Sequence, residues 1–177
     1  GKKIIVTRAR HQASVLQEAL EEKGAEAYLL PTIQLTPNEE VEAELETTLQ
    51  SLSRYDWILF TSPNAVEFFF SALHQRGKDS RHLAPCKIGA LGPMTAEALR
   101  AYGITADFIP QEYYAKVFAE EFIQRARLAP VQRILLPNSA LAGDDLSELL
   151  SEAGIACHRL PLYQNTPISY TASELKE

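Results

Sequence analysis

Hydroxyl, amide and guanidinium side chains directly follow several apolar segments of this chain, in turns that each precede a predicted helix. In an open parallel sheet, ligands bind at the carboxyl ends of the strands, where such turns lie. The first turn of each helix also presents free backbone N–H groups and a positive dipole end to the same cleft. The pattern predicts a ligand-binding edge with the candidate residues Thr7, Arg8, Thr61, Ser62, Asn64, Gly92, Thr95, Asn138 and Ser139.

Two of these side chains also have a purely structural interpretation, and so does one further tyrosine. Plain N-capping of a helix explains Ser62 or Thr95 without any ligand. Tyr163 ends the last predicted strand, and a phenol with an unperturbed pKa of about 10 is protonated at neutral pH. It could donate a hydrogen bond or a proton to a leaving hydroxyl. Packing as a half-buried aromatic residue explains Tyr163 equally well.

The sequence lacks the motifs of several other chemistries. Residues 89–93 lack the third glycine of a dinucleotide fingerprint, and no Gly-Lys-Ser/Thr phosphate loop follows them. No Gly-x-Ser-x-Gly elbow occurs, and no histidine is placed to pair with a nucleophile. Cys86 and Cys157 are far apart, and the 4 histidines lack partners at metal-ligand spacing. We therefore expect neither a metal nor a cofactor.

Composition indicates an ordinary globular protein, with 46% hydrophobic and 23% charged residues over 177 positions. The net charge is −6, and no basic stripe with interleaved aromatic residues is present, which disfavours nucleic-acid binding. Apolar runs are too short to span a bilayer, and no signal region opens the sequence. We expect a cytoplasmic protein that binds neither nucleic acid nor membrane.

Strands and helices are predicted to alternate along the chain. The first predicted helix has Val15, Leu16, Ala19 and Leu20 on its apolar stripe, and Gly24 ends it. Asp144 or Asp145 is expected to cap the last helix, which Gly154 ends. The predicted strands are residues 3–7, 27–30, 55–60, 87–91, 106–110, 133–136 and 158–163, and further helices are predicted from residue 37 and over 65–74, 96–102 and 115–125.

This alternation predicts an α/β fold with parallel sheets covered on both faces. Residues 55–163 supply five predicted strands, enough for a complete open lobe of flavodoxin-like size. Residues 1–35 supply only two strands and one helix. A two-stranded parallel piece cannot cover both faces of its sheet, so we expect this first unit to need more chain.

Four motifs resemble uroporphyrinogen-III synthases in order and spacing. They are Val-Thr-Arg-Ala-Arg from residue 6, Phe-Thr-Ser-Pro-Asn-Ala-Val-Glu from residue 60, Ile-Gly-Ala-Leu-Gly-Pro-Met-Thr-Ala from residue 88, and Leu-Tyr-Gln-Asn from residue 162. The resemblance implies two flavodoxin-like lobes joined by a two-stranded linker, with the active site in the cleft between them. Residues 1–35 would begin a discontinuous first lobe, 36–163 would form a complete second lobe, and 164–177 would return toward the first. A second Phe-Thr-Ser-like turn and a second Ile-Gly-Pro-like turn are missing, so the C-terminal half of the family's sequence, and half of the expected cleft, is expected to be absent.

The resemblance also implies an activity. The family converts hydroxymethylbilane, a linear tetrapyrrole with an acetate and a propionate on each ring, to uroporphyrinogen III by dehydrative cyclisation with inversion of ring D, in haem, sirohaem and cobalamin biosynthesis. No cofactor is implied, and the full-length protein would be a monomer. Catalysis would rest on orienting the substrate. The candidate turns would bind substrate, Tyr163 would assist hydroxide departure, and Arg8 and Arg10 either add charge near the cleft or are solvated loop arginines.

Three other interpretations stay open at this point. A non-catalytic tetrapyrrole-binding module of a larger fused protein would carry the same motifs. A periplasmic-type binder of two α/β lobes is weakened by the absence of a signal peptide in the sequence. A nucleotide-dependent enzyme is weakened by the missing phosphate motif.

Overall fold

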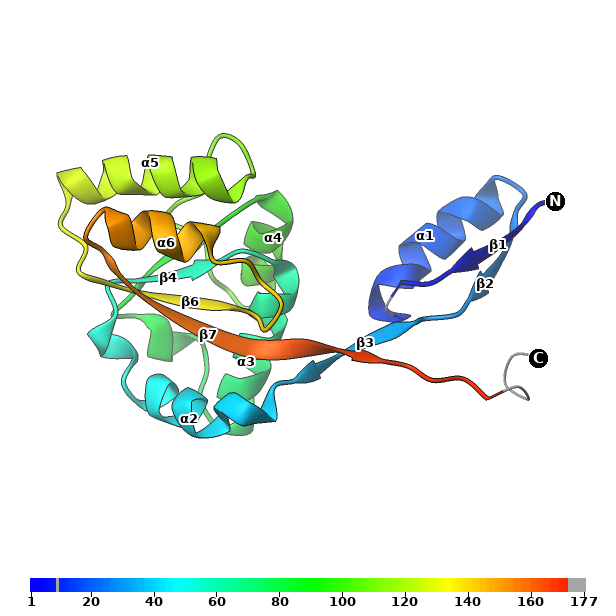
Figure 1. The fold of residues 1–177 in the computed structure, drawn as a ribbon, viewed down its shortest axis with the longest axis horizontal. Helices are drawn as coiled ribbons and strands as arrows, with labels where there is room; N and C mark the ends of the chain where they lie inside the picture. Colours follow the sequence, from blue (N-terminus) through cyan, green and yellow to red (C-terminus); the bar gives the residue numbers. More distant parts are fainter. Residues whose placement is uncertain (9, 172–177) are drawn as a thin grey trace. The chain divides into compact units, whose positions relative to one another are not determined.

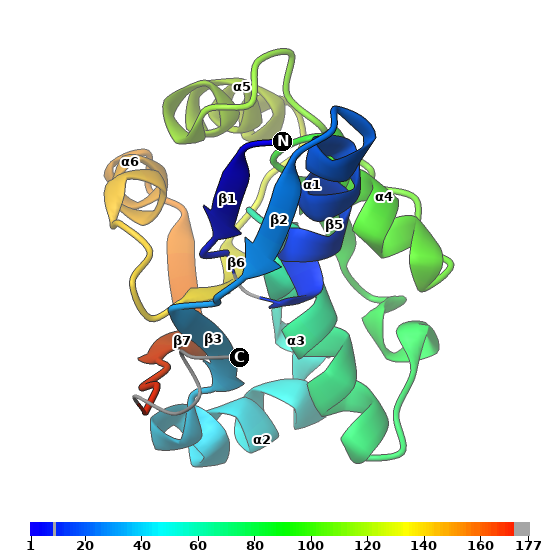
Figure 2. The same cartoon turned by 90° about the vertical axis from the view of Figure 1, so that its right-hand side faces the viewer.

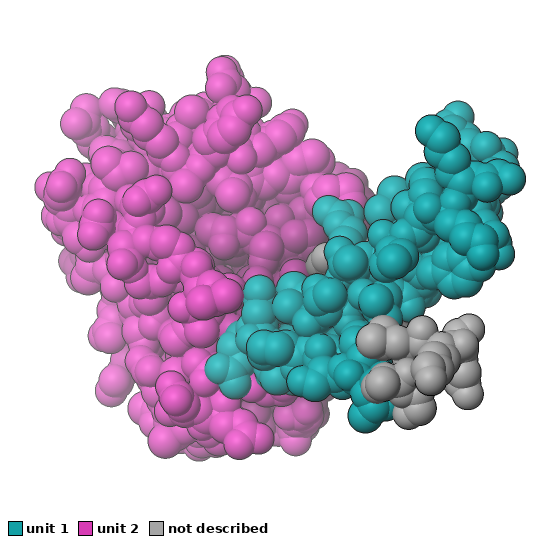
Figure 3. Space-filling view, turned by 45° about the vertical axis from the view of Figure 1, so that its right-hand side comes forward, with its two compact units in different colours: residues 1–36, 164–177 teal, residues 37–163 magenta. Residues whose placement is uncertain are grey.

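The structure, a computed structural model, describes residues 1–8 and 10–171 and divides into two compact units. Unit 1 contains Gly1–Thr36 and Gln164–Glu177, and unit 2 contains Pro37–Tyr163, as coloured in Figure 3. The boundaries fall within strands β3 (Ile33–Pro37) and β7 (Ala156–Pro167). The chain therefore passes between the units twice, each time as an extended strand.

Unit 1 begins with a β-α-β segment formed by β1 (Lys3–Val6), α1 (Arg10–Glu22) and β2 (Glu26–Leu29). The strands β1 and β2 are parallel, and Gly24 after α1 has a φ of 77°, which confirms the predicted left-handed end of this helix. The predicted apolar stripe of α1 is wrong, because Val15 is 76% exposed and Leu16 40% exposed while Ala13 is fully buried. Two strands of four residues each offer a helix little surface, so α1 buries a small residue instead.

Unit 2 contains most of the regular elements, which alternate between helix and strand as predicted except between α4 and α5, where no full strand forms (Figure 1). They are η1 (Glu39–Val41), α2 (Glu42–Gln50), η2 (Leu52–Arg54), β4 (Trp57–Phe60), α3 (Pro63–Gln75), η3 (Ser80–Leu83), β5 (Lys87–Ala90), α4 (Pro93–Ala101), α5 (Ala115–Leu128), β6 (Arg133–Ser139) and α6 (Asp145–Glu152), followed by β7.

The larger sheet has the strand order β3-β7-β6-β4-β5, and the pairs β4–β5, β4–β6 and β6–β7 are parallel. At the edge, Asn38 N donates to Leu162 O and Ile168 N donates to Thr32 O, so β3 runs antiparallel to β7. The mixed α/β class with a mainly parallel sheet is therefore confirmed. The chain continues from β4 to β5 on one side and returns to β6 on the other, which makes the β4–β6 junction the topological switch point.

The predicted strand over residues 106–110 is wrong as a full strand. Only Phe108 forms a bridge, with Gly89 of β5. The Asp107 side chain accepts the Ile88 N–H at 2.7 Å, which is a bond that a regular ladder would give to a carbonyl. Pro110 has no N–H to continue the pairing. Four strands and one bridge thus stand where five strands were predicted in residues 55–163.

Alternate residues of β4 pack against helices on opposite faces of the sheet, because side chains of a strand alternate in direction. Trp57 and Leu59 join a buried cluster with Phe118 and Phe122 of α5 and with Leu146 and Leu150 of α6. Phe60 instead meets Phe69 of α3 edge to face, with ring centroids 5.4 Å apart. The ribbon shows α5 and α6 on one side of the sheet and α3 on the other (Figure 1 and Figure 2).

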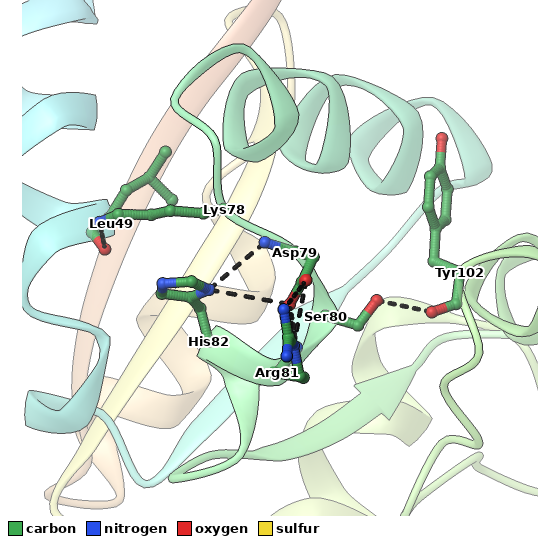
Figure 4. A network of polar contacts seen from close by, with 7 residues as sticks. All are labelled: Leu49, Lys78, Asp79, Ser80, Arg81, His82 and Tyr102. Atoms are coloured by element: carbon green, nitrogen blue, oxygen red, sulfur yellow. Dashed lines mark hydrogen bonds and ion pairs between the residues drawn. The ribbon is translucent and has the colours of Figure 1, made fainter.

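A polar cluster fixes the connection between α3 and β5, as Figure 4 shows. Asp79 accepts the Arg81 N–H at 3.0 Å and caps η3, and the hydrogen bond from the Arg81 side chain lowers the pKa of Asp79 to about 2. Lys78 Nζ donates to Leu49 O at the end of α2, and Ser80 Oγ donates to Tyr102 O at the end of α4. These bonds satisfy carbonyls at helix ends, so the cluster has a structural role.

Across the described part of the chain, no helix has both the length and the apolar character needed to cross a membrane.

Candidate functional site

A pocket of about 170 Å³ lies at the carboxyl ends of the strands, where the switch point predicts ligand binding. It is formed by the turns that follow β4, β5 and β6 and by the first residues of α5 and α6. Its lining residues are Thr61, Leu91, Ala115, Leu136, Asn138, Ala142, Gly143, Asp145 and Leu146. Two predicted site residues that are 77 positions apart, Thr61 and Asn138, are therefore brought together here.

Asn138 is the most unusual residue of this pocket. It is only 3% exposed, and its Oδ1 atom is buried without a hydrogen-bond partner in the described structure. A buried polar atom left without a partner costs about 1–3 kcal/mol, and such atoms are rare in folded proteins. A ligand that offered a hydrogen-bond donor to this amide would remove that cost, which makes the pocket a candidate binding site.

The pocket contains no cationic side chain, and Asp145 contributes a carboxylate to its wall. The expected capping by Asp144 or Asp145 is not observed, because α6 has no side-chain cap. Asp144 instead forms an ion pair with Arg159, whose Nη2 also donates to Ala142 O at 2.8 Å. Arg159 thus holds the loop before α6 against β7. This pocket therefore suits an uncharged part of a ligand better than a carboxylate.

The helix starts at this edge differ in their ability to receive an anion. The first turn of α3 is capped by Ser62, whose Oγ accepts the Ala65 N–H at 3.1 Å, and this confirms the capping interpretation for Ser62. The first turn of α6 already contains Asp145 and Glu148. In contrast, α4 begins at Gly92 with neither a side-chain cap nor an acidic residue in its first turn. The N–H groups and positive end of α4 are therefore available to an anionic ligand, as are those of α5, which also begins with neither a side-chain cap nor an acidic residue in its first turn.

Exposed aromatic residues lie beside the start of α4 and were missed by the sequence reasoning. A Cβ atom on Gly92 would lie 3.3 Å from Cγ of Tyr113, so the tyrosine ring packs directly on this glycine. Tyr113, Tyr114 and Met94 are all largely exposed. The only signal in the sequence was a pair of adjacent tyrosines in a polar loop after Pro110. Thr95, predicted to face ligand, is buried and only 3% exposed.

Tyr163 lies near these turns but does not line the pocket. It is 6% exposed, its ring stacks on Phe68 at 4.8 Å, and its hydroxyl is 3.2 Å from Ser62 Oγ. The β6–β7 register places Ser139 opposite Tyr163, and Ala140 N donates to Tyr163 O. The structure thus joins three predicted residues from β6, β7 and the start of α3. Both packing and proton donation remain compatible with this position.

The remaining predicted residues are distributed as follows. Asn64 is half-buried in the first turn of α3, and Ser139 Oγ accepts the Leu141 N–H. Thr7 and Arg8 are exposed after β1 in unit 1, where Thr7 O accepts the Thr32 N–H. The side chain of Arg10 lies outside the described residues. Over residues 1–8 and 10–171, no group of three His, Cys, Asp or Glu side chains is arranged to hold a metal ion.

Comparisons with known proteins show which family this chain resembles. A family model described as "Uroporphyrinogen-III synthase HemD" matches residues 14–177. "Porphyrin biosynthesis protein HemD" of Ruminiclostridium josui is 33% identical over 177 residues, and "Uroporphyrinogen-III synthase" of Synechococcus elongatus is 32% identical over 168 residues. These matches cover 100% and 93% of this chain but only 34% and 61% of the two relatives.

Two solved structures have a similar fold. A crystal structure of a mutant uroporphyrinogen III synthase from the extremely thermophilic bacterium Thermus thermophilus matches with a TM-score of 0.67 at 20% identity, over 95% of this chain and 64% of that one. The uroporphyrinogen-III synthetase of Helicobacter pylori matches with a TM-score of 0.60 at 19% identity, over 99% of this chain and 67% of that one. At these identities the likeness establishes a shared fold.

Proposed function

The chain belongs to the uroporphyrinogen-III synthase family, and we propose that the protein catalyses the dehydrative cyclisation of hydroxymethylbilane to uroporphyrinogen III in tetrapyrrole biosynthesis. The substrate's terminal hydroxyl leaves as water, which generates an electrophilic azafulvene. The last ring then closes in inverted orientation through a spiro intermediate. The family membership supports the reaction, and the pocket with the unpartnered Oδ1 atom of Asn138 is the structural observation that carries the choice of site.

Units 1 and 2 correspond, in this proposal, to parts of two flavodoxin-like lobes, with residues 1–35 and 164–177 in one lobe and 36–163 in the other. The strand order around the switch point and the extended crossings through β3 and β7 support this division. A cytoplasmic location, a monomeric state and the absence of a cofactor are further parts of the proposal and rest on the family resemblance.

The two sides of the carboxyl edge have different roles in substrate binding. Substrate carboxylates bind at the start of α4, where no acidic side chain competes for the backbone N–H groups. A pyrrole ring, which is uncharged and carries an N–H donor, occupies the pocket lined by Thr61 and Asn138. This division explains how a chain of net charge −6 binds a polyanion, since the charges nearest to the ligand dominate over distant ones.

The protein supplies orientation and one proton donor. Holding the linear tetrapyrrole so that the inverted carbon of the last ring meets the azafulvene makes the ring closure effectively unimolecular. Tyr163 assists the departing hydroxide, and its bond to Ser62 Oγ fixes the direction of the phenol. Thr7 and Arg8 in unit 1, and Asn64 and Ser139 in unit 2, complete the substrate-binding residues.

The test is a turnover assay of the full-length protein with hydroxymethylbilane, read out as the ratio of uroporphyrinogen isomers. The expected product is isomer III, whereas spontaneous cyclisation gives the uninverted isomer. Asn138→Leu is expected to lower kcat/KM by about tenfold or more, the value of a lost hydrogen bond in a buried site. Thr48→Val on α2, another buried polar position, is the matched control and is expected to leave isomer III production unchanged.

Two results would contradict the proposal. Production of only the uninverted isomer by a folded, full-length protein would remove the activity. If that protein bound the linear tetrapyrrole without converting it, the non-catalytic binding function would replace the enzymatic one. Full activity in Asn138→Leu would leave the reaction in place but would exclude the pocket as its site.

A further inference from the structure

The amino ends of the strands carry a second and larger pocket, of about 350 Å³, which plays no part in the proposed reaction. It lies between the start of β4, the start of β5 and the C-terminal half of α5. Its lining residues are Asp56, Trp57, Lys87, Phe122, Arg125, Ala126, Leu128, Ala129, Pro130 and Val131. We propose that this amino-edge pocket binds a small organic anion with an apolar ring.

The walls of the pocket are apolar and aromatic. Trp57 and Phe122 meet edge to face with ring centroids 5.1 Å apart and form its buried floor. Leu128 is 89% exposed at the rim, which is unusual for a residue of this size on a helix. Burying such a side chain against a ligand contributes about 25 cal/mol for each Å² of apolar surface removed from water. An apolar ring therefore has both a floor and a rim to pack against.

Two cations flank the floor. Lys87 Nζ lies 5.7 Å from the centre of the Trp57 ring, and Arg125 Cζ lies 5.6 Å from it. Neither side chain has an ion pair with a carboxylate among the described residues, although acidic side chains outnumber basic ones in the chain by 23 to 17. Two cations without carboxylate partners beside an apolar cavity favour an anionic ligand.

The one carboxylate in the lining, that of Asp56, already accepts hydrogen bonds from the protein backbone. Asp56 Oδ2 accepts the N–H groups of Gln132 and Arg133, at 2.7 Å and 3.0 Å. These bonds hold the loop before β6 and leave Lys87 and Arg125 as the charged groups available to a ligand. The amino-edge pocket thus has two cations and one carboxylate in its wall, whereas the carboxyl-edge pocket has one carboxylate and no cation.

The chain contains a built-in reporter for this pocket. Trp57 is the only tryptophan of the chain and lies in the floor of this pocket, so it is the single energy donor, and the variants at Lys87, Arg125 and Leu128 assign the bound probe to the amino edge. The probe is 1-anilinonaphthalene-8-sulfonate, which has an aromatic body and one negative charge. The matched neutral probe is N-phenyl-1-naphthylamine, which lacks only the sulfonate. Binding is measured as energy transfer from Trp57 to each probe, with the folded state checked by circular dichroism.

The 177-residue chain is expected to bind the sulfonate more tightly than the neutral probe at low salt, and the difference is expected to shrink as salt is added. The double variant Lys87→Gln/Arg125→Gln should weaken sulfonate binding about tenfold, the value of two exposed charges at up to about 0.7 kcal/mol each. Arg100→Gln/Lys116→Gln removes two exposed cations elsewhere and should leave binding unchanged.

Leu128→Asp provides a variant that cannot fail by unfolding the core, because this side chain is almost fully exposed. It places a negative charge on the rim and should weaken the sulfonate more than the neutral probe. Equal affinity for both probes, or sulfonate binding that survives the Lys87/Arg125 and Leu128 variants, would overturn the proposal. None of these outcomes depends on whether the protein cyclises hydroxymethylbilane.

Discussion

Replacing Tyr163 with phenylalanine separates the catalytic interpretation of this residue from the structural one. The change removes one oxygen atom and keeps the ring that stacks on Phe68 with an interplanar angle of 12°. Ser62 Oγ loses its contact with the phenol but keeps the N–H of Ala65, so no cap is lost. The structural cost is one neutral hydrogen bond, or about 0.5–1.5 kcal/mol in the free energy of unfolding.

The catalytic cost is expected to be larger. Proton donation by a positioned side chain contributes about 10²–10⁴-fold to a rate, which corresponds to about 3–5 kcal/mol in the activation barrier. If Tyr163 assists hydroxide departure, Tyr163→Phe lowers kcat by about a hundredfold or more while KM changes little. A residue that only packs would change the unfolding free energy and leave kcat within about twofold.

The two quantities are measured in different experiments. Urea unfolding gives the structural term, and single-turnover cyclisation of hydroxymethylbilane gives the catalytic one. Ser62→Ala and the double variant complete a cycle that isolates the Tyr163–Ser62 coupling. Wild-type kcat in Tyr163→Phe, together with a loss of about 1 kcal/mol in stability, would refute the catalytic role and leave Tyr163 as a packing residue.

Two further predictions concern stability and thiol chemistry. Gly89→Ala should destabilise the chain by about 1–3 kcal/mol in urea unfolding, because the new Cβ would lie 2.6 Å from Leu59 Cδ2 in the core. The control is Gly143→Ala, whose new Cβ meets no atom within 4 Å and which should leave the free energy of unfolding nearly unchanged. Burial raises the pKa of Cys86 and of Cys157 to about 11, so both thiols should react with a disulfide reagent at pH 8 far more slowly in the native chain than in urea. The pKa of an unfolded cysteine is about 8.5, so between pH 8.5 and about 11 the thiol loses its proton in the unfolded state but not in the folded state. The free energy of unfolding is therefore highest below pH 8.5 and falls as the pH rises toward 11. Equal native and denatured reaction rates would contradict the thiol prediction.

Local signals predicted the ends of elements well. Ser62-Pro63 marks the start of α3 because serine accepts an N–H of the first turn and proline suits the first helical position. Gly24 and Gly154 both have positive φ after their helices, a conformation that glycine adopts without steric cost. These features depend on residues within one turn of each other, so a short window of sequence contains the whole cause.

Features that depend on distant partners were predicted poorly. Whether α1 buries Val15 or Ala13 depends on the surface that its sheet offers, which the helical period does not encode. The segment around Phe108 has the composition of a strand, but the Asp107 side chain takes over a ladder bond of β5. Tyr163 and Ser62 are 101 residues apart, and Asn138, whose Oδ1 is buried, lies just before a turn that Arg159 contacts from another strand.

The candidate turns looked like equivalent anion-binding positions in the sequence. The caps and acidic residues in the first turn of each following helix make them differ in their ability to bind an anion. The first turn of α6 is matched by the chain's own acidic residues, that of α3 is capped by Ser62, and that of α4 has neither. The proposed carboxylate binding at α4 uses backbone N–H groups that are fixed in place, whereas the proposed binding at the amino edge uses the exposed side chains of Lys87 and Arg125, whose charges are screened by solvent. Added salt should therefore weaken binding at α4 less than binding at the amino edge. The response to salt therefore distinguishes the two edges of one sheet, since the same net charge of −6 surrounds both and only the nearest groups differ.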